Sequence, residues 1–116
     1  MTDERELLTR VYAAFNARDV EVVLAALHPD VDWPNGWEGG HLTGRDAVRE
    51  YWTRQWAAID PRVEPVGFEN DEIGRTAVTV HQVVRDLSGA VVSDGTVRHV
   101  YAFEDGLVRS MEIQPG

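Results

Sequence analysis

The 116-residue sequence contains no cysteine and no lysine, and these two absences exclude several classes of site. Without cysteine there is no disulfide framework, thiol nucleophile, Cys-ligated zinc or iron–sulfur cluster. Without lysine there is no Schiff base and no P-loop lysine. No apolar run approaches the roughly 20 residues that span a membrane, so no membrane association is expected. The acidic start, MTDERELL, is unlike a basic signal peptide and predicts a cytoplasmic protein.

Positive charge is also scarce. Eleven basic residues, all arginine, oppose 20 acidic residues, which gives a net charge of −9. An acidic surface repels nucleic acid and anionic lipid, and no stretch of the chain carries a basic cluster. We therefore expect no nucleic-acid partner, and a ligand that is small and is not a polyanion.

The remaining composition is that of a folded globular protein. Apolar residues make up 43% of the chain and charged residues 27%, values that argue against intrinsic disorder. The length suits one hydrophobic core, and no linker or repeat interrupts it. We expect a single domain over residues 1–116.

The first half of the sequence has helical periodicity and the second half alternates. A first helix should end near Ala17, a second should follow Asp19, and a third should run from about Arg45 to Ile59. Between the second and third helices, a short strand at 31–33 and then a loop or hairpin are expected because of the glycines there. The strands expected after Pro61 lie near 62–69, 75–86, 90–104 and 107–114.

Turn residues set the topology that we expect for these strands. Asp105-Gly106 is a strong hairpin signal, and Asp94-Gly95 suggests a bulge or bend inside a long strand. Three N-terminal helices packed on one face of a curved antiparallel sheet make an α+β domain.

Strand alternation indicates which side chains face the helices. On the strand expected over 96–104, the side chains predicted to face inward are Val97, His99, Tyr101 and Phe103. On 107–113, the matching side chains are Leu107, Arg109, Met111 and Ile113. His99 would then be an ionisable group in an apolar interior. For 76–86 the choice stays open, because one face offers Val78, Val80 and Gln82 and the other includes His81.

At this point the sequence resembles a known superfamily. The stretches RVYAAFNARDVE (10–21), ALHPDVDW (26–33), LTGRDAVREYW (42–52) and TVRHVYAFEDGLVRSMEI (96–113) are similar to the SnoaL-like and ketosteroid isomerase-like branch of the nuclear transport factor 2-like superfamily. The resemblance implies a conical domain with an apolar pocket at one end and a homodimer through the exposed sheet face. The superfamily includes isomerases, cyclases, dehydratases and non-catalytic binding proteins, so the resemblance leaves the activity open.

Ketosteroid isomerases use a carboxylate base together with a tyrosine and a protonated aspartate that form an oxyanion hole. The resemblance places that tyrosine at Val11, with Tyr12 about 100° away on the helix. It places the base at Trp33, beside Asp32, and the aspartate at His99. None of the three residue types matches, so we reject steroid isomerisation by that mechanism.

Three residues are candidates for the chemistry. His99 could transfer protons near neutral pH, or it could be a buried neutral histidine with a satisfied hydrogen bond. Asp32 could orient His99 or act as a base, or it could lie in water at a strand edge. His81 could share the cavity if its ring points inward. The run His28-Pro-Asp30-Val-Asp32 has alternating potential ligands but no recognised metal spacing, so we expect neither a metal nor another cofactor.

Aromatic and apolar residues are the candidates for the pocket wall. Trp52 and Trp56 share one face of the third helix, and Trp37 lies in a Gly-rich loop where it could cover the pocket mouth. The predicted substrate-binding residues are Val11, Tyr12, Phe15, Trp33, Trp37, Trp52, Trp56, Tyr101, Met111 and Ile113. Core packing is the alternative for part of this set.

Three functional hypotheses follow. The first is a cofactor-independent acid/base enzyme, an isomerase, cyclase or dehydratase type, that acts on a small apolar substrate. The second is a binding module in which His99 only hydrogen-bonds the ligand. The third is a dimerising accessory domain whose core is filled.

Overall fold

The helices begin and end close to where the sequence predicts them. In the computed structural model, which describes residues 3–35, 39–71 and 74–115, they are α1 (Asp3–Asn16), α2 (Val20–Ala25) and α3 (Arg45–Ala58). Asp19 caps α2, because its carboxylate accepts a hydrogen bond from the Val22 backbone N–H at 3.5 Å.

Six strands in the described ranges form one sheet. They are β1 (Leu27–Pro34), β2 (His41–Thr43), β3 (Ile59–Asn70), β4 (Thr76–Asp86), β5 (Val91–Glu104) and β6 (Leu107–Pro115), in the spatial order β2-β1-β6-β5-β4-β3. The predicted α+β class with three helices is confirmed. The sheet is mixed, however, because β1 pairs with β6 in parallel. Turn signals specify neighbouring strands only, and this long-range pair has none.

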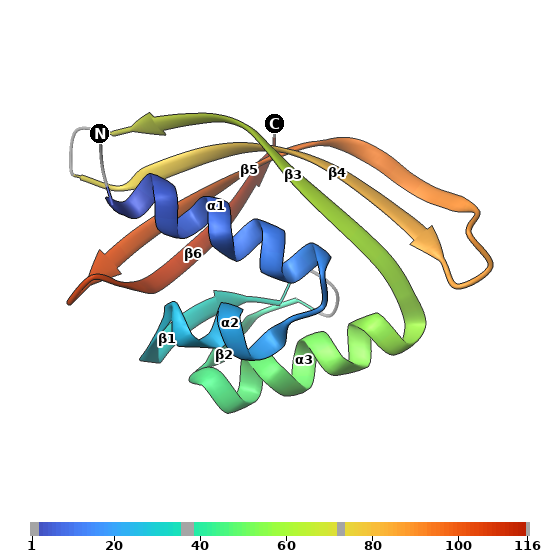
Figure 1. Cartoon of the computed structure of the whole chain (residues 1–116), viewed down its shortest axis with the longest axis horizontal. Coiled ribbons are helices and arrows are strands. Elements are labelled where there is room, and N and C mark those ends of the chain that lie inside the picture. Colours follow the sequence, from blue (N-terminus) through green and yellow to red (C-terminus); the bar gives the residue numbers. More distant parts are fainter. Residues whose placement is uncertain (1–2, 36–38, 72–73, 116) are drawn as a thin grey trace.

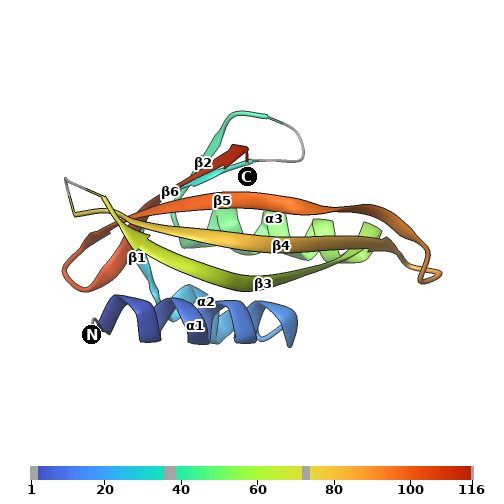
Figure 2. The ribbon, with the colours of Figure 1, turned by 90° about the horizontal axis from the view of Figure 1, so that it is seen from above.

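The sheet curves around the helices. Figures 1 and 2 show α1 and α2 along one side of the long strands, and α3 beside β1, β2 and the start of β3. The β4–β5 hairpin extends beyond the helices at the end opposite the N-terminus (Figure 1).

The segment predicted as a short strand and a loop or hairpin is a hairpin. Its first strand is longer than predicted, since β1 covers Leu27–Pro34, and β2 pairs with it antiparallel through Asp32↔Thr43 and Pro34↔His41. Trp37 lies outside the described residues.

Two irregularities differ from the sequence-based expectation. Asp94-Gly95 does not bend the ladder, because Gly95 pairs regularly with Gln82 and the register shifts nearer the hairpin, beyond Val84. A second shift lets Ala102 pair with Ser110 and Phe103 with Val108, so that one residue of β6 is extra. That bulge turns Arg109 outward and buries Val108, which corrects the inward set predicted for β6.

The hydrophobic core lies between the helices and the concave face. Its fully buried members include Leu8 of α1, Val23 of α2, Val48 of α3 and Val78 of β4. None of the helices in the described ranges is long and apolar enough to cross a membrane.

Candidate functional site

An apolar cavity of about 100 Å³ lies inside the curve of the sheet. The described residues that line it are Val11, Tyr12, Phe15, Val23, Trp33, Pro34, Tyr51, Trp52, Gln55, Pro61, Val63, Gln82, His99, Tyr101, Met111 and Ile113. We call this space the inner cavity. Eight of the ten predicted wall residues line it, and so does His99.

His99 reaches the inner cavity because of the phase of β5. His99 pairs directly with Val78, and side chains opposite one another across a strand pair project from the same face. Val78 is fully buried, so that face is the concave one. Tyr101 is two residues further along β5 and projects from the same face.

Two tyrosines join His99 in a chain of hydrogen bonds. The Tyr12 hydroxyl lies 2.8 Å from Nδ1 of His99 and 2.7 Å from the Tyr101 hydroxyl. The ring of Tyr12 also stacks on that of His99, with centroids 5.9 Å apart and planes 13° from parallel. The chain therefore runs from Tyr101 through Tyr12 to His99.

Burial keeps all three groups neutral. It lowers the pKa of His99 to about 4, because the imidazolium would lose its hydration. Burial also raises the pKa of Tyr12 well above its ordinary value, with a further contribution from the neighbouring Tyr101, and it raises the pKa of Tyr101. At neutral pH the hydrogen-bond chain Tyr101–Tyr12–His99 therefore consists of two phenols and one uncharged imidazole.

The second ring nitrogen of His99, Nε2, has free hydrogen-bonding capacity in a residue that lines the cavity. No group in the described part of the chain hydrogen-bonds Nε2, although Nδ1 has Tyr12 as its partner. A neutral imidazole carries one donor and one acceptor nitrogen. Nε2 can therefore meet a ligand either as an N–H donor or as a basic lone pair, depending on where the proton of the ring resides.

A larger hollow of about 670 Å³, which we call the outer basin, adjoins the inner cavity. Five described residues border both spaces: Pro34, Tyr51, Gln55, Gln82 and Ile113. The basin is completed by His41, Glu112 and Gln114. The chain thus offers a narrow apolar end beside His99 and a wider, more polar entrance.

Asp32 and His81 do not reach either space. Asp32 is on the opposite side of β1 from Trp33 and lies 3.1 Å from Nδ1 of His41. His81 pairs with Thr96, out of phase with His99, and its Nε2 lies 2.7 Å from Asp94 on the outer face of the sheet. Neither residue can partner His99 in this structure; Tyr12 is the partner instead.

The position of Tyr12 also corrects the expectation, taken from the family resemblance, that this side chain points about 100° away from the family tyrosine. Val11, where the family tyrosine was placed, and Tyr12 both line the inner cavity. The Tyr12 hydroxyl is the one that reaches His99, so an offset of one residue on α1 does not direct it away from the site.

The aromatic wall is partly pocket and partly core. Trp33 and Trp52 meet edge to face at 5.4 Å and line the inner cavity. Trp56 is not among the lining residues; it packs on Phe15 at 5.2 Å and on Trp52 at 6.1 Å, behind the wall.

Sequence reasoning missed Tyr51, Gln55 and Gln82 as lining residues. Tyr51 and Gln55 flank Trp52 at helical spacing, and the Gln55 amide donates to the Tyr51 hydroxyl at 3.4 Å. Gln82 shares a strand face with Val78 and Val80. The pairing of Val78 with His99 identifies that face as the inward one, but only the fold supplies this pairing.

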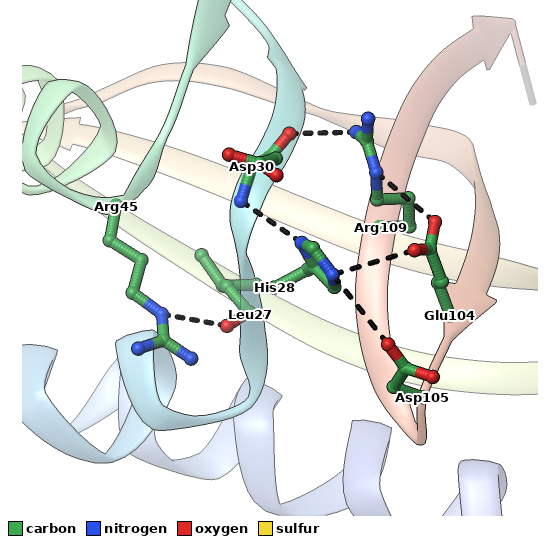
Figure 3. Close-up of polar contacts among 7 residues, drawn as sticks. All are labelled: Leu27, His28, Asp30, Arg45, Glu104, Asp105 and Arg109. Carbon is green, nitrogen blue, oxygen red and sulfur yellow. Dashed lines mark hydrogen bonds and ion pairs between the residues drawn. The ribbon is translucent and has the colours of Figure 1, made fainter.

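A second polar cluster lies where β1 meets the β5–β6 hairpin (Figure 3). Nε2 of His28 is 3.6 Å from Glu104 and 4.0 Å from Asp105. Arg109 binds the Asp30 carbonyl at 2.7 Å and lies 3.4 Å from Glu104. These contacts hold the start of β1 beside β6.

The tautomer of His28 bears on whether this cluster can hold a cation. The Asp30 backbone N–H donates to Nδ1 of His28 at 3.0 Å, so a neutral ring carries its proton on Nε2. Figure 3 joins that atom by dashed lines to the carboxylates of Glu104 and Asp105. A metal ion would need the lone pair of that nitrogen. The geometry therefore suits hydrogen bonding. Asp32, the third member of the sequence run, lies elsewhere, against His41.

Comparison with known proteins identifies the family. The sequence profile of the SnoaL-like domain matches residues 8–111, most of the chain. The protein belongs to the SnoaL-like domain family. No curated protein matches this SnoaL-like domain in sequence.

Solved structures similar to this SnoaL-like domain support the assignment. An NTF2-like protein of unknown function from Burkholderia pseudomallei is 28% identical, with a TM-score of 0.86 over 100% of this chain and 92% of its own. TerC, co-crystallised with polyporic acid, is 26% identical, with a TM-score of 0.85 over 99% and 92% of the two chains. A Mycobacterium tuberculosis protein in complex with estradiol-17beta-hemisuccinate is 19% identical and shares the fold, with a TM-score of 0.79 over 92% and 88%.

Proposed function

We propose that this SnoaL-like domain is a cofactor-independent enzyme that moves a proton within a small, mostly apolar carbonyl substrate, in a reaction of the isomerase, cyclase or dehydratase type. The observation that carries the proposal is the chain Tyr101–Tyr12–His99, whose free end, Nε2, opens into an apolar cavity. Structures with the same fold hold small organic molecules, polyporic acid in TerC and an estradiol derivative in the Mycobacterium protein.

The hydrogen-bond chain has two arrangements of equal charge. In the first, Tyr101 donates to Tyr12, Tyr12 donates to Nδ1 of His99, and Nε2 carries the ring proton. In the second, Nδ1–H donates to Tyr12, Tyr12 donates to Tyr101, and Nε2 presents a lone pair. A buried imidazole with a pKa of about 4 is a weak base by itself. It accepts a proton at Nε2 more readily if it releases one at Nδ1.

The second arrangement can enolise a carbonyl compound without creating a charge. Nε2 takes the proton from the carbon beside the carbonyl, and the electron pair of the broken C–H bond becomes the C=C bond of the enol. Nδ1 passes its proton to Tyr12, Tyr12 passes its own to Tyr101, and Tyr101 gives its hydroxyl proton to the carbonyl oxygen. The chain is left in the first arrangement, and proton exchange with water or the reverse step on the enol resets it.

The test is deuterium incorporation into a small aryl ketone such as acetophenone, in deuterium oxide. His99→Gln and Tyr12→Phe should each lower the enzymatic exchange rate by at least about 100-fold, the usual contribution of a positioned proton-transfer group. His81→Gln is the matched control, because His81 lies on the outer face. The rate should be flat around neutral pH and should fall only toward the His99 pKa of about 4. Equal rates in wild type and His99→Gln would refute catalysis by His99.

A second candidate function is ligand binding without catalysis. The low pKa of His99 favours it, because a weakly basic ring that does not pass its Nδ1 proton to Tyr12 can serve only as a hydrogen-bond partner. The same experiment distinguishes catalysis from binding alone. A ketone that binds the wild type but shows no enzymatic exchange indicates a protein that binds the ligand without catalysis. The inner cavity argues against the third hypothesis, a filled core.

We also propose that the protein, as a single domain, forms a homodimer through the exposed sheet. The support is a group of exposed apolar side chains, Leu87, Val91 and Val92, where the β4–β5 hairpin extends beyond the helices (Figure 1). Apolar surface of this kind is stabilised when another surface covers it.

A further inference from the structure

The outer basin has a distinctive chemistry. The chain contains three glutamines, Gln55, Gln82 and Gln114, and all three line the basin. They come from three different elements, α3, β4 and β6, which lie far apart in the sequence. The fold therefore brings the side chains of all three glutamines together at the entrance of the inner cavity.

Two of these amides have free hydrogen-bonding capacity. Among the residues that the structure describes, no partner hydrogen-bonds the side chain of Gln82 or Gln114, whereas Gln55 donates to Tyr51 at 3.4 Å. Each free amide offers one carbonyl acceptor and two N–H donors. These free amides can hydrogen-bond a ligand group that both donates and accepts, such as an amide or a hydroxyl. They can also donate to a group that only accepts, such as a carbonyl.

The charged residues around the two spaces limit the class of ligand further. No arginine is among the described residues that line the inner cavity or the basin, and the chain has no lysine. The one carboxylate of the described lining is that of Glu112. The histidine of the lining, His41, already has the Asp32 carboxylate 3.1 Å from its Nδ1, and Arg75 lies 3.5 Å from the Glu112 carboxylate. An anionic substituent would therefore lose hydration at the basin without gaining an unpaired cationic partner, and it would meet a chain of net charge −9.

The two spaces differ in what they admit. An apolar cavity of about 150 Å³ in another protein holds benzene. The inner cavity is smaller, at about 100 Å³, so it holds no more than one flat ring or a small apolar group, and the rest of a larger ligand must extend into the basin.

We infer that the outer basin is a specificity site for the uncharged polar end of the substrate, with Gln82 and Gln114 as the residues that select it. The ligand class is a compound with an aromatic or small apolar end for the inner cavity and an amide, hydroxyl or carbonyl end for the basin. This inference rests on the proposed function for the inner cavity, and it adds the part of the ligand that the cavity cannot hold.

A matched ligand series tests it. Propylbenzene, hydrocinnamamide and hydrocinnamate share a phenyl ring and a three-carbon chain and differ only at the end. Binding is followed by calorimetry and by the fluorescence of the tryptophans that line the cavity, Trp33 and Trp52. We expect hydrocinnamamide to bind at least about fivefold more tightly than hydrocinnamate, which corresponds to about one hydrogen bond.

The variants separate the basin from the cavity. Gln82→Leu and Gln114→Leu should each weaken hydrocinnamamide by about threefold to tenfold. Gln114→Leu, at a residue that lines the basin and not the inner cavity, should leave propylbenzene within about twofold. Glu112→Gln should leave hydrocinnamamide within about twofold and improve hydrocinnamate, because it removes the carboxylate of the basin. His81→Gln, on the outer face, should change none of the three affinities.

The outcomes distinguish this inference from the proposed function. If propylbenzene binds but hydrocinnamate binds as tightly as hydrocinnamamide, or if both leucine variants bind hydrocinnamamide as the wild type does, the basin is not a specificity site and the inner cavity still stands. If none of the three compounds binds, the ligand site in the inner cavity fails, and the basin inference fails with it.

Discussion

At the scale of single residues, Tyr12 decides what His99 can do. Without the hydroxyl of Tyr12, the buried ring of His99 would have no protein partner at Nδ1, and the Tyr101 hydroxyl would lose its neighbour as well. Unpaired polar atoms in a buried site cost about 1–3 kcal/mol each. The tyrosine therefore makes a neutral histidine tolerable inside the apolar wall, and it leaves Nε2 as the atom available to a ligand.

The burial of His99 predicts an acid-sensitive fold. The pKa of His99 falls from 6.5 to about 4 on folding, so between these pH values the unfolded chain binds a proton that the folded chain does not. The contribution of the neutral ring to stability is fully present above about pH 6.5 and is lost as the pH falls toward 4, to an extent of about 3 kcal/mol.

Urea unfolding at neutral and mildly acidic pH measures this contribution. Relative to the wild type, His99→Gln should lose less free energy of unfolding on acidification, because glutamine does not titrate. The same substitution at His81, a half-buried position on the outer face of the sheet, controls for the change of residue type. A wild type and a His99→Gln variant with identical pH dependence would show that the ring is not buried in its neutral form.

At the scale of elements, local patterns predicted the strands and their faces, and long-range pairing corrected them. The alternation Val97–His99–Tyr101 is a property of β5 alone, so the inward position of His99 could be read from the sequence. The face of β4 could not, because both of its faces carry apolar residues and only its register with β5 separates Gln82 from His81. The bulge at Arg109 depends in the same way on tertiary pairing.

Another interaction that no pattern signals fixes α1 against the edge of the sheet. The Asn16 side-chain amide donates to the Val63 carbonyl at 2.6 Å, and its oxygen accepts from the Val63 N–H at 2.9 Å. Asn16 therefore pairs with β3 as a strand residue would. Asn16 comes one helical turn after Tyr12, and Val63 lines the inner cavity, so this pair also sets the distance across the site.

Asn16→Ala should lower the free energy of unfolding by about 1–3 kcal/mol, because it leaves both backbone groups of Val63 without their partner. Asn70→Ala is the matched control on the same strand, where the amide makes one hydrogen bond, to Thr76 at 3.2 Å. Urea denaturation compares the two. If the control variant is destabilised as much as Asn16→Ala, the pairing of Asn16 with β3 has no special role.

At the scale of the whole molecule, charge and shape act in opposite directions. A net charge of −9 on a small domain repels other copies of the chain, whereas burial of the exposed apolar end of the β4–β5 hairpin would favour the proposed homodimer. The first effect follows from the composition of the chain. The second depends on which valines and leucines the fold leaves uncovered, and a hydropathy pattern does not distinguish Val92, exposed at the hairpin, from Val78, buried in the core.

The proposed homodimer should therefore become tighter as the ionic strength rises, because salt screens the repulsion between two acidic chains while the apolar contact persists. Sedimentation velocity at about 0.05 M and about 0.5 M salt measures the dissociation constant, which we expect to fall several-fold. The double variant Leu87→Glu, Val92→Glu should be monomeric under both conditions, since it places carboxylates on the contact. Val22→Glu adds a carboxylate at a comparably exposed valine on α2, away from the sheet, and should dimerise nearly as the wild type does. A wild type that stays monomeric at high salt, or a double variant that dimerises as well as Val22→Glu, would exclude the hairpin as the contact.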